Sequence, residues 1–244
     1  MRAIVLAGGY AKRLQPVLRD IPKPLLPVKG KPIVDYIVEK LFELDEIDEI
    51  IVLTNRRLAG RFREWVKNRK YRGIKIVAEP SRHEEEKLGS LGAIAWLISI
   101  KKLKEDCLII GGDNLFTSSL KPVMEYHGKI RAPLLVVYDL RSKRLAQEYS
   151  VVKLDSKSRV VGFVEKPKRP NSTLIGTCIY VMPKRILKML HKYLREGGNP
   201  DSPGHFIQWL HKRTNVYGYR LKGQWYDIGT PKTYQKARET FQPD

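Results

Sequence analysis

The sequence predicts an α/β protein of the Rossmann-like type, an α/β/α sandwich around a mixed and mostly parallel sheet. Short apolar runs that read as buried strands alternate with segments of helical spacing. In this part of the chain we expect strands at 3–6, 50–54, 74–78 and 107–110, and helices at 32–44, 58–67 and 93–100. Such alternation is typical of parallel sheets with right-handed crossovers. Ligands of these sheets gather at the carboxyl ends of the strands.

The later part of the chain is expected to be richer in strands. Residues 149–154 and 159–164 read as a hairpin, because the segment DSKS at 155–158 has typical turn chemistry. Further strands are expected at 133–138, 174–182 and 215–222, and further helices at 183–194, 205–211 and 231–240. The predicted sheet is therefore mixed rather than purely parallel.

A chain of 244 residues, 42% of them hydrophobic, is long enough to bury a full core as one domain. No apolar run approaches the ~18 residues of a membrane span, and the N-terminus leads directly into a strand. We therefore expect a cytoplasmic protein with neither a signal peptide nor a membrane anchor. Cys107 and Cys178 lack CxxC spacing and are expected to be buried small residues, not a disulfide or metal pair.

The formal net charge is +20, from 46 Lys and Arg against 26 Asp and Glu, and it makes a basic nucleic-acid-binding protein one alternative. Against this alternative, the cations are spread along the chain among glutamates, and no nucleic-acid module is visible. Abundant Lys, Arg and Glu also fit the surface of a thermophile's protein. A positive field would in addition steer small anionic ligands toward a cleft.

Residues 6–28, LAGGYAKRLQPVLRDIPKPLLPV, follow the first strand and predict a phosphate-binding loop. Small residues at the end of a strand let main-chain N–H groups approach an anion closely. Arg13 and Lys23 supply two cations ten residues apart, which suit a triphosphate, and the prolines around them stiffen the loop. The residues expected to bind the triphosphate are Leu6, Ala7, Gly8, Gly9, Arg13 and Lys23.

Two aspartates far apart in the sequence predict a Mg²⁺ site. Asp113 follows the strand 107–110 in the segment GGDN, at a carboxyl end where ligands gather. Asp227 lies in the segment WYDIGTP, residues 225–231. Mg²⁺ takes one or two protein carboxylates, and substrate phosphates and water complete its shell. We therefore expect Asp113 and Asp227 to converge on one metal ion.

The loop after the first strand resembles the signature of the sugar-phosphate nucleotidyltransferases (NDP-sugar pyrophosphorylases), LAGGxGTRLxPxTxxxPKPLxPVxxKP. The positions in register are Gly8, Gly9, Arg13, Leu14, Pro16, Pro22, Lys23, Pro24, Pro27, Val28, Lys31 and Pro32. The chain departs from the signature at Ala11-Lys12, where the family has Gly-Thr, and at Leu18. The segments GDN and W-x-D-I-G-T-P-x-x-Y extend the resemblance from Ala3 to Tyr234. It implies a nucleotidyltransferase fold of the GT-A-like kind.

Residues 79–92, EPSRHEEEKLGSLG, are similar to the family's segment E…LGTAGA, which holds the nucleotide base. The resemblance places Glu79 at the edge of the base and Gly89 beside it, with Ser90 and Leu91 where Thr and Ala are frequent. A carboxylate only accepts hydrogen bonds, so Glu79 suits the N1–H and N2–H donors of guanine. We therefore favour GTP, with dTTP and UTP as open alternatives.

The EKP segment at 165–167 resembles the family's sugar-phosphate segment. By that resemblance Glu165 accepts hydrogen bonds from sugar hydroxyls, and Lys166 holds the sugar phosphate. In a later loop the family often has an acidic residue that closes over the sugar, which makes Asp201 the candidate here. The strand 174–182 resembles the family's NAGIYV strand but has Thr and Cys in place of Ala and Gly.

The resemblance implies Mg²⁺-dependent transfer of a nucleotidyl group from an NTP to a hexose 1-phosphate, with release of pyrophosphate. No catalytic base is required, because the second pKa of a phosphate monoester is about 6 and its oxygen is ionised at neutral pH. The expected catalytic residues are Arg13, Lys23, Asp113 and Lys166. We expect one domain over residues 1–244, with a nucleotide half of about 1–130 and a sugar half of about 131–244.

The expected partners are the NTP and the sugar 1-phosphate, without nucleic acid or membrane, and the oligomeric state stays open. A cytidylyltransferase acting on a non-sugar phosphate such as phosphocholine is the alternative among enzymes, because it shares the glycine loop and the Pro-Lys. The EKP and WYDIGTP segments favour the sugar-phosphate enzyme over this alternative.

Overall fold

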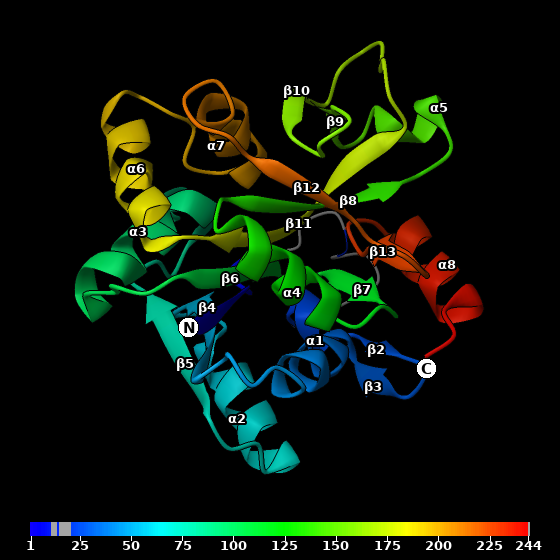
Figure 1. The fold of residues 1–244 in the computed structure, drawn as a ribbon. Coiled ribbons are helices and arrows are strands. Elements are labelled where there is room, and N and C mark those ends of the chain that lie inside the picture. Colours follow the sequence, from blue (N-terminus) through cyan, green and yellow to red (C-terminus); the bar gives the residue numbers. More distant parts are fainter. Residues whose placement is uncertain (11–13, 15–20, 244) are drawn as a thin grey trace. The chain divides into compact units, whose positions relative to one another are not determined.

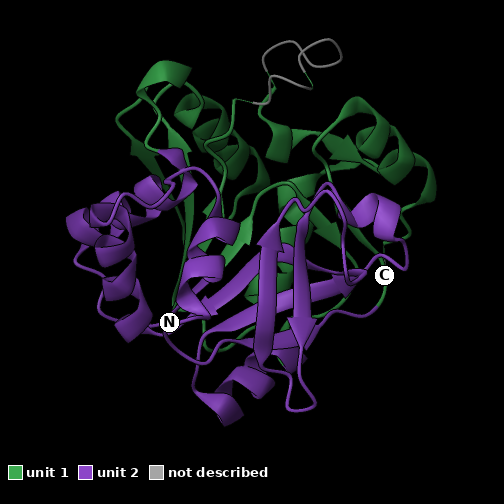
Figure 2. Ribbon diagram, turned by 90° about the horizontal axis from the view of Figure 1, so that it is seen from above, with its two compact units in different colours: residues 1–88, 109–121, 223–244 green, residues 89–108, 122–222 purple. Residues whose placement is uncertain are grey.

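The computed structural model describes residues 1–10, 14 and 21–243. The chain divides into two compact units, which Figure 2 shows in two colours. Unit 1 comprises Met1–Leu88, Ile109–Lys121 and Gly223–Asp244, and unit 2 comprises Gly89–Leu108 and Pro122–Lys222. Both units are built from separate segments, so the C-terminal segment lies in the same unit as the first strand. The predicted nucleotide and sugar halves, divided near residue 130, stay a prediction.

Unit 1 is organised around parallel strands (Figure 1). β1 (Arg2–Leu6), β4 (Glu49–Asn55) and β5 (Ile74–Glu79) pair in parallel. Their order is β6-β1-β4-β5, and β6 (Cys107–Gly111) belongs to unit 1 with its residues 109–111. β1 and β4 are mostly buried Ile, Val and Leu, as expected for strands covered on both faces. Because β1, β4 and β5 run in parallel, their carboxyl ends lie along one edge of the sheet.

Two helices of unit 1 share a buried carboxylate. α1 (Ile33–Phe42) begins directly after Pro32, and α2 (Ala59–Arg69) ends at a residue in the left-handed conformation. Asp35 on α1 is only 1% exposed, and it accepts a hydrogen bond of 2.7 Å from the Trp65 indole N–H of α2. The Arg69 guanidinium lies 2.7 Å from the other oxygen of this carboxylate. The buried charge is therefore paired, as a charge removed from water must be.

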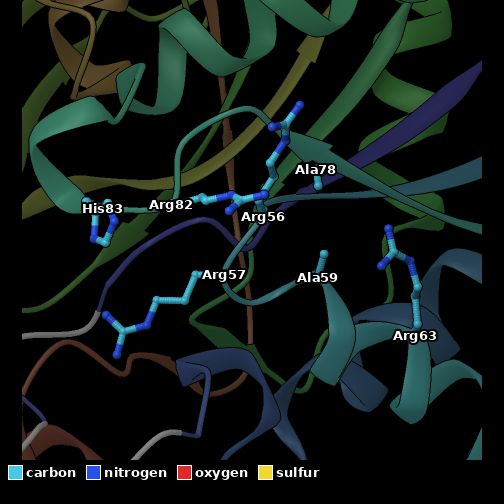
Figure 3. Close-up of a pocket in the computed structure, with 7 residues that line it drawn as sticks. All are labelled: Arg56, Arg57, Ala59, Arg63, Ala78, Arg82 and His83. Atoms are coloured by element: carbon cyan, nitrogen blue, oxygen red, sulfur yellow. The ribbon is translucent and has the colours of Figure 1, made fainter.

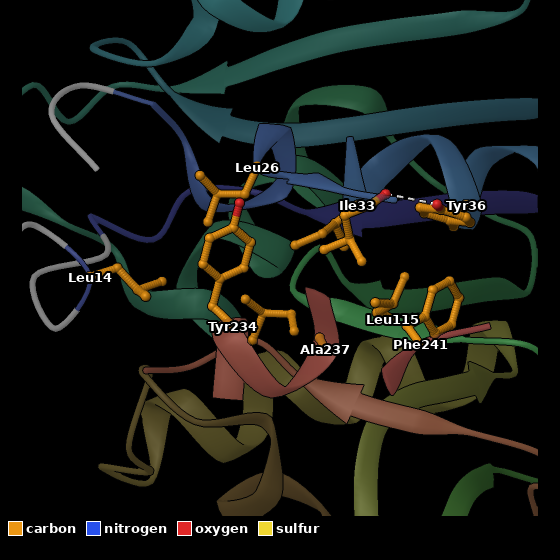
Figure 4. Packing of buried hydrophobic residues seen from close by; sticks show 10 residues of the cluster. Leu14, Leu26, Ile33, Tyr36, Leu115, Tyr234, Ala237 and Phe241 are labelled. Carbon is orange, nitrogen blue, oxygen red and sulfur yellow. Dashed lines mark hydrogen bonds between the residues drawn. The ribbon is translucent and has the colours of Figure 1, made fainter. Parts of the chain in front are cut away.

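A hydrophobic cluster in unit 1 connects the Pro-Lys-Pro segment to the C-terminal helix (Figure 4). Its members are Leu14, Leu26, Val28, Ile33, Tyr36, Leu115, Ile228, Tyr234, Ala237 and Phe241. The hydroxyls of Tyr36 and Tyr234 donate hydrogen bonds of 2.8 Å to the carbonyls of Val28 and Pro27. Both tyrosines thereby satisfy their polar ends while their rings stay in the core.

The short elements that border this cluster carry candidate site residues. They are the 3-10 helix η2 (Lys23–Leu25), the strands β2 (Pro27–Val28), β3 (Lys31–Pro32), β7 (Asn114–Phe116) and β13 (Trp225–Asp227), and the helix α8 (Pro231–Thr240). β2 pairs with β3, and β7 pairs with β13, in both cases antiparallel. The cluster therefore fixes the positions of η2 and of the β7–β13 pair within unit 1.

Unit 2 is built mainly from antiparallel strands (Figure 1). The strands are β8 (Leu134–Asp139), β9 (Ser150–Leu154), β10 (Val160–Glu165), β11 (Leu174–Met182) and β12 (Tyr217–Arg220). β10 pairs with β9, β9 with β11 and β11 with β8, all antiparallel, and β12 pairs in parallel with β8. The helices are α3 (Gly89–Lys101), α4 (Lys121–Ile130), α5 (Lys143–Ala146), α6 (Lys184–Arg195) and α7 (Pro203–Leu210).

The predicted fold class, an α/β protein with a mixed sheet, is confirmed. The predicted hairpin is the pair β9–β10, although its register shifts between Val160 and Gly162. The helix expected at 93–100 begins four residues earlier, because the N–H groups of Leu91 and Gly92 reach the carbonyl of Pro200. Among the described residues, no helix is long and apolar enough to cross a membrane.

Candidate functional site

The glycine turn at the end of β1, residues 6–9, is held by its carbonyl groups. The carbonyl of Leu6 accepts from Gly112 N–H at 2.9 Å, and that of Gly8 accepts from the Asn55 side-chain amide at 2.9 Å. The Ala7 carbonyl accepts from the Thr54 hydroxyl at 3.0 Å. Within the described part of the chain, the N–H groups of Gly8 and Gly9 donate no hydrogen bond. The turn therefore offers main-chain donors to a ligand, as the predicted phosphate contact requires.

Lys23 and Asp113 form an ion pair beside this turn. The Lys23 Nζ lies 2.9 Å from Asp113 Oδ2, and both side chains are partly buried. Gly112 makes this approach feasible, because a Cβ there would lie 2.7 Å from the Leu6 carbonyl oxygen and 2.9 Å from the Pro24 ring. A predicted phosphate ligand and a predicted metal ligand are thus adjacent. Arg13, the other predicted cation, lies outside the described residues.

Backbone pairing brings the two predicted metal ligands together. β7 and β13 are antiparallel, with Asp227 opposite Asn114, the residue after Asp113. The N–H of Ile228 donates to the Asp113 carbonyl at 3.0 Å. The Trp225 indole N–H donates to the Asn114 side-chain carbonyl at 2.7 Å, and this buried contact fixes the register of the pair. Asp227 therefore lies at the end of this ladder, and Asp113 immediately precedes it, so their main chains are neighbours.

The two carboxylates have the chemistry that a divalent cation prefers. Hard oxygen ligands are what Mg²⁺ prefers, and it rarely needs more than two from the protein when phosphates are bound. In the described ranges, no group of three or more His, Cys, Asp or Glu side chains could hold a metal ion. A cation at Asp113 and Asp227 would thus depend on substrate oxygens and water for the rest of its shell.

Glu79, the predicted base contact, is buried at the end of β5. It is 4% exposed, and its carboxylate accepts hydrogen bonds from the N–H of Ser81 at 3.1 Å and from the Ser81 hydroxyl. Tyr10 extends this network, since its hydroxyl lies 3.3 Å from the Ser81 hydroxyl and donates to the carbonyl of His83. The carboxylate is therefore fixed in orientation, and each oxygen keeps capacity for a second hydrogen bond.

Gly89, in unit 2, is required by its conformation and by its neighbour. Its φ is +74°, and a Cβ there would overlap the carbonyl of Pro200 and lie 2.9 Å from the Cα of Asp201. The N–H of Leu91 donates to the same Pro200 carbonyl at 2.8 Å. The start of α3 therefore holds the loop that carries Asp201, which connects two predicted site residues that the sequence analysis treated separately.

Glu165, also in unit 2, is held by residues that the sequence analysis did not single out. Its carboxylate accepts a hydrogen bond from the Ser150 hydroxyl and a longer one, 3.5 Å, from the Ser202 hydroxyl. Gly204 in the first turn of α7 leaves space for the carboxylate, since a Cβ there would overlap Glu165 Oε2. Lys166 follows with an exposed side chain and a φ of +44°. Ser150 lies opposite Glu165 in the β9–β10 ladder because the register shifts between Val160 and Gly162, which the sequence pattern does not reveal.

Tyr180 on β11 also interacts with Glu165. Burial raises the pKa of the Tyr180 phenol well above its usual range, and electrostatic interactions with Cys178 and Glu165 add to the rise. The phenol therefore stays protonated at neutral pH and cannot act as a base there.

The predicted residues fall into two groups. Unit 1 holds Leu6, Ala7, Gly8, Gly9, Lys23, Glu79, Asp113 and Asp227, and unit 2 holds Gly89, Glu165, Lys166 and Asp201. In unit 1 the glycine turn is bonded to Gly112, Lys23 pairs with Asp113, and Asp227 is opposite the residue after Asp113. Such a set can bind a metal-bound polyphosphate.

Comparison with known sequences identifies the family. Residues 2–243 match the sequence model of the family described as nucleotidyl transferase. The chain is 33% identical over 238 residues to an assigned mannose-1-phosphate guanyltransferase of Sulfolobus acidocaldarius, covering 96% of this chain and 61% of that protein. It is 31% identical over 242 residues to D-glycero-alpha-D-manno-heptose 1-phosphate guanylyltransferase of Aneurinibacillus thermoaerophilus, covering 99% of both. It is 29% identical to the bifunctional protein GlmU of Methanocaldococcus jannaschii and spans 52% of that protein's length.

Solved structures share the fold. An assigned glucose-1-phosphate thymidylyltransferase of Bacillus anthracis superposes with a TM-score of 0.82 at 24% identity, covering 98% of this chain and 94% of that one. A UDP-glucose pyrophosphorylase superposes with a TM-score of 0.81 at 20% identity, covering 98% and 97%. The chain therefore belongs to the nucleotidyl transferase family, which confirms at the family level the resemblance to the sugar-phosphate nucleotidyltransferases.

Proposed function

We propose that this chain transfers a nucleotidyl group from an NTP to a sugar 1-phosphate and releases pyrophosphate. The observation that carries this proposal is the arrangement in unit 1, where Asp227 on β13 pairs with Asn114, the residue after Asp113, and Lys23 lies 2.9 Å from Asp113. The glycine turn borders the same place through the hydrogen bond from Gly112 to Leu6. Membership of the family supports the same reaction class.

The residues of unit 1 would bind the nucleotide. Asp113 and Asp227 would hold Mg²⁺, which when bound would neutralise the polyphosphate and draw charge from the reacting phosphorus. The free N–H groups of Gly8 and Gly9 would donate to phosphate oxygens, and Lys23 would turn from Asp113 to the phosphate chain. Arg13, outside the described residues, is assigned to the phosphates from its place in the motif.

The residues of unit 2 would bind the sugar 1-phosphate. Glu165 would accept hydrogen bonds from sugar hydroxyls, Lys166 would bind the sugar phosphate, and Asp201 would contact the sugar. One phosphate oxygen attacks the α-phosphorus, the bond from that phosphorus to the bridging oxygen breaks, and pyrophosphate leaves with the electron pair. The attacking oxygen is already ionised, so the protein's contribution is to orient the substrates, which can lower the barrier by on the order of 7–11 kcal/mol.

We propose GTP as the nucleotide and a manno-configured sugar 1-phosphate as its partner. The Glu79 carboxylate can accept the two adjacent N–H groups of guanine, and Ser81 already holds it in one orientation. Two of the similar proteins are named for guanylyl transfer, one to mannose 1-phosphate and the other to a manno-heptose 1-phosphate.

A pyrophosphate-release assay tests both the proposed reaction and the proposed substrates. It uses a matrix of five NTPs and several hexose and heptose 1-phosphates, with Mg²⁺ or with EDTA. The expected result is Mg²⁺-dependent release that is fastest with GTP and mannose 1-phosphate or its heptose analogue. A rate with UTP or dTTP about tenfold above that with GTP would overturn the choice of base. Absence of release from every pair, or release only with a non-sugar phosphate, would overturn the reaction.

A further inference from the structure

Unit 1 contains a second basic region, which adjoins Glu79 but lies on the β4–β5 side of the sheet and not beside Asp113. It is a cavity of about 680 Å³ whose basic lining residues are Arg56, Arg57, Arg63, Arg82 and His83, called here the arginine cavity (Figure 3). Ligand pockets commonly have volumes of about 300–1,000 Å³. The arginine cavity is therefore large enough to hold a small molecule.

Neighbouring strands bring these side chains together. Arg56 and Arg57 follow β4, Arg63 lies on α2, and Arg82 follows β5, the strand that pairs with β4. The N–H of Arg56 donates to the carbonyl of Ser81 at 3.0 Å, which ties the two loops to each other. The arginines thus surround the carboxyl ends of β4 and β5, where parallel sheets place their ligands, although their side chains extend in different directions (Figure 3).

Two arginines of the arginine cavity lack a compensating charge. The described residues of its lining include no carboxylate. The side chains of Arg56 and Arg63 make no ion pair with another residue in the described part of the chain. Glu86 lies beside the cavity, accepts from the N–H groups of Arg82 and His83 at 2.8 and 3.3 Å, and compensates part of the charge of Arg82. Several like charges around one concavity favour an anion inside it.

The start of α2 adds to this preference. Ala59, the first residue of α2, lines the arginine cavity, and among the described residues no side chain caps the first N–H groups of this eleven-residue helix. The first N–H groups of a helix and its dipole both favour an anion. Guanidinium groups such as those of Arg56 and Arg63 bind phosphate oxygens through two parallel hydrogen bonds.

We propose that the arginine cavity binds a chain of two or three linked phosphates, either as an inorganic anion or as part of a nucleotide. The positive charge of several guanidinium groups exceeds the negative charge of a single phosphate, which is about two at neutral pH. The site is separate from Asp113, because β1 lies between β6 and β4 in the strand order of unit 1. The proposal does not depend on the reaction proposed above.

Calorimetric titration of the full chain with inorganic triphosphate, in EDTA at about 150 mM salt, tests the site. The test variant is Arg56→Gln/Arg63→Gln/Arg82→Gln, three exposed side chains whose replacement spares the core. The matched control is Arg61→Gln/Lys67→Gln/Arg72→Gln, which removes the same charge from exposed positions of unit 1 outside the lining. We expect the test variant to bind triphosphate about tenfold or more weakly, and the control to stay within about twofold of the wild type.

Further titrations locate the site and identify the source of the phosphate chain. A Lys23→Ala variant should still bind triphosphate in the arginine cavity, because Lys23 does not line that cavity. If the arginine cavity binds triphosphate but not GTP, its ligand is an inorganic anion. If it binds GTP more tightly than triphosphate, and the test variant loses this binding too, its ligand is a nucleotide. The proposal is overturned if test and control variants weaken alike, if Lys23→Ala removes the same binding, or if a short single-stranded oligonucleotide displaces triphosphate from the wild type.

Discussion

Asp227 in unit 1 and Glu165 in unit 2 are held in different ways. Main-chain pairing places Asp227, because the β7–β13 ladder sets it opposite Asn114. Side-chain hydroxyls and a close-packed glycine place the carboxylate of Glu165, as Ser150 and Gly204 show. The position of Asp227 should therefore tolerate changes of neighbouring side chains better than the position of Glu165.

The largest effect is expected from Asp113→Ala, which tests the group in unit 1. With the proposed metal ligands Asp113 and Asp227, the variant retains one carboxylate, so kcat should fall about a thousandfold or more while the circular dichroism spectrum stays unchanged. Steady-state pyrophosphate release measures this, with the exposed Asp45→Ala as control. Activity above about a tenth of wild type would show that Asp113 does not hold the metal.

Gly204→Ala tests the group in unit 2 without touching a predicted site residue. The new methyl group would overlap Glu165 Oε2 and lie 2.7 Å from the Ser150 hydroxyl oxygen, so the carboxylate must move. We expect kcat/KM for the sugar 1-phosphate to fall about tenfold to a hundredfold, with the KM for NTP little changed. The control is Gly128→Ala, a helical glycine of unit 2 with open space around it. Equal kinetics for both variants would contradict the role of packing in unit 2.

Comparing Gly89→Ala with Gly197→Ala separates the cost of a positive φ from the cost of a clash with a neighbouring residue. Both glycines have positive φ, +74° and +80°, but only at Gly89 would a Cβ meet another residue, Pro200. Urea unfolding should show Gly197→Ala destabilised by about 1 kcal/mol and Gly89→Ala by about 2–3 kcal/mol. The KM values for NTP and sugar 1-phosphate should both rise in Gly89→Ala. Equal destabilisation would mean that the contact with Pro200 adds nothing.

The smallest effect is expected on the pH dependence of the free energy of unfolding, through His211 in unit 2. Burial lowers the pKa of His211, and Lys212 adds to this, so the unfolded chain binds a proton more readily than the folded one. The stabilising contribution is present above the unfolded pKa of about 6.5 and is lost as pH falls through the lower folded pKa. Urea unfolding at pH about 7.5 and about 5.5 should show a smaller loss of stability for His211→Gln than for the wild type. An identical loss would exclude this contribution.

The group in unit 1 was largely predictable from sequence, because its members lie in contiguous motifs at the ends of apolar strands. A glycine turn after β1 and a GGDN segment after β6 both mark carboxyl ends, and parallel pairing brings such ends to one edge. Asp227 was predicted to lie near this edge for two reasons: a carboxylate is a ligand that Mg²⁺ prefers, and the segment WYDIGTP matches a family motif. The identity of the cation partner of Asp113, Lys23, required coordinates.

The support of Glu165 in unit 2 was not predictable in the same way. A regular hairpin around residues 155–158 would place a different residue opposite Ser150, but the register shift between Val160 and Gly162 brings Glu165 there. The early start of α3 depends on Pro200, more than a hundred residues later in the chain. Periodicity and turn chemistry describe local sequence, and they contain no information on such distant contacts.

The β7–β13 pair also joins segments that are synthesised at different times. Translation proceeds from the N-terminus, and early segments can fold while the rest is still being made. Residues 223–244 supply one strand of that pair and the helix that packs on the same cluster, and they leave the ribosome after the other segments of unit 1. A nascent chain that ends at β12 therefore carries β7 but lacks the strand that pairs with it, so this ladder forms late in synthesis.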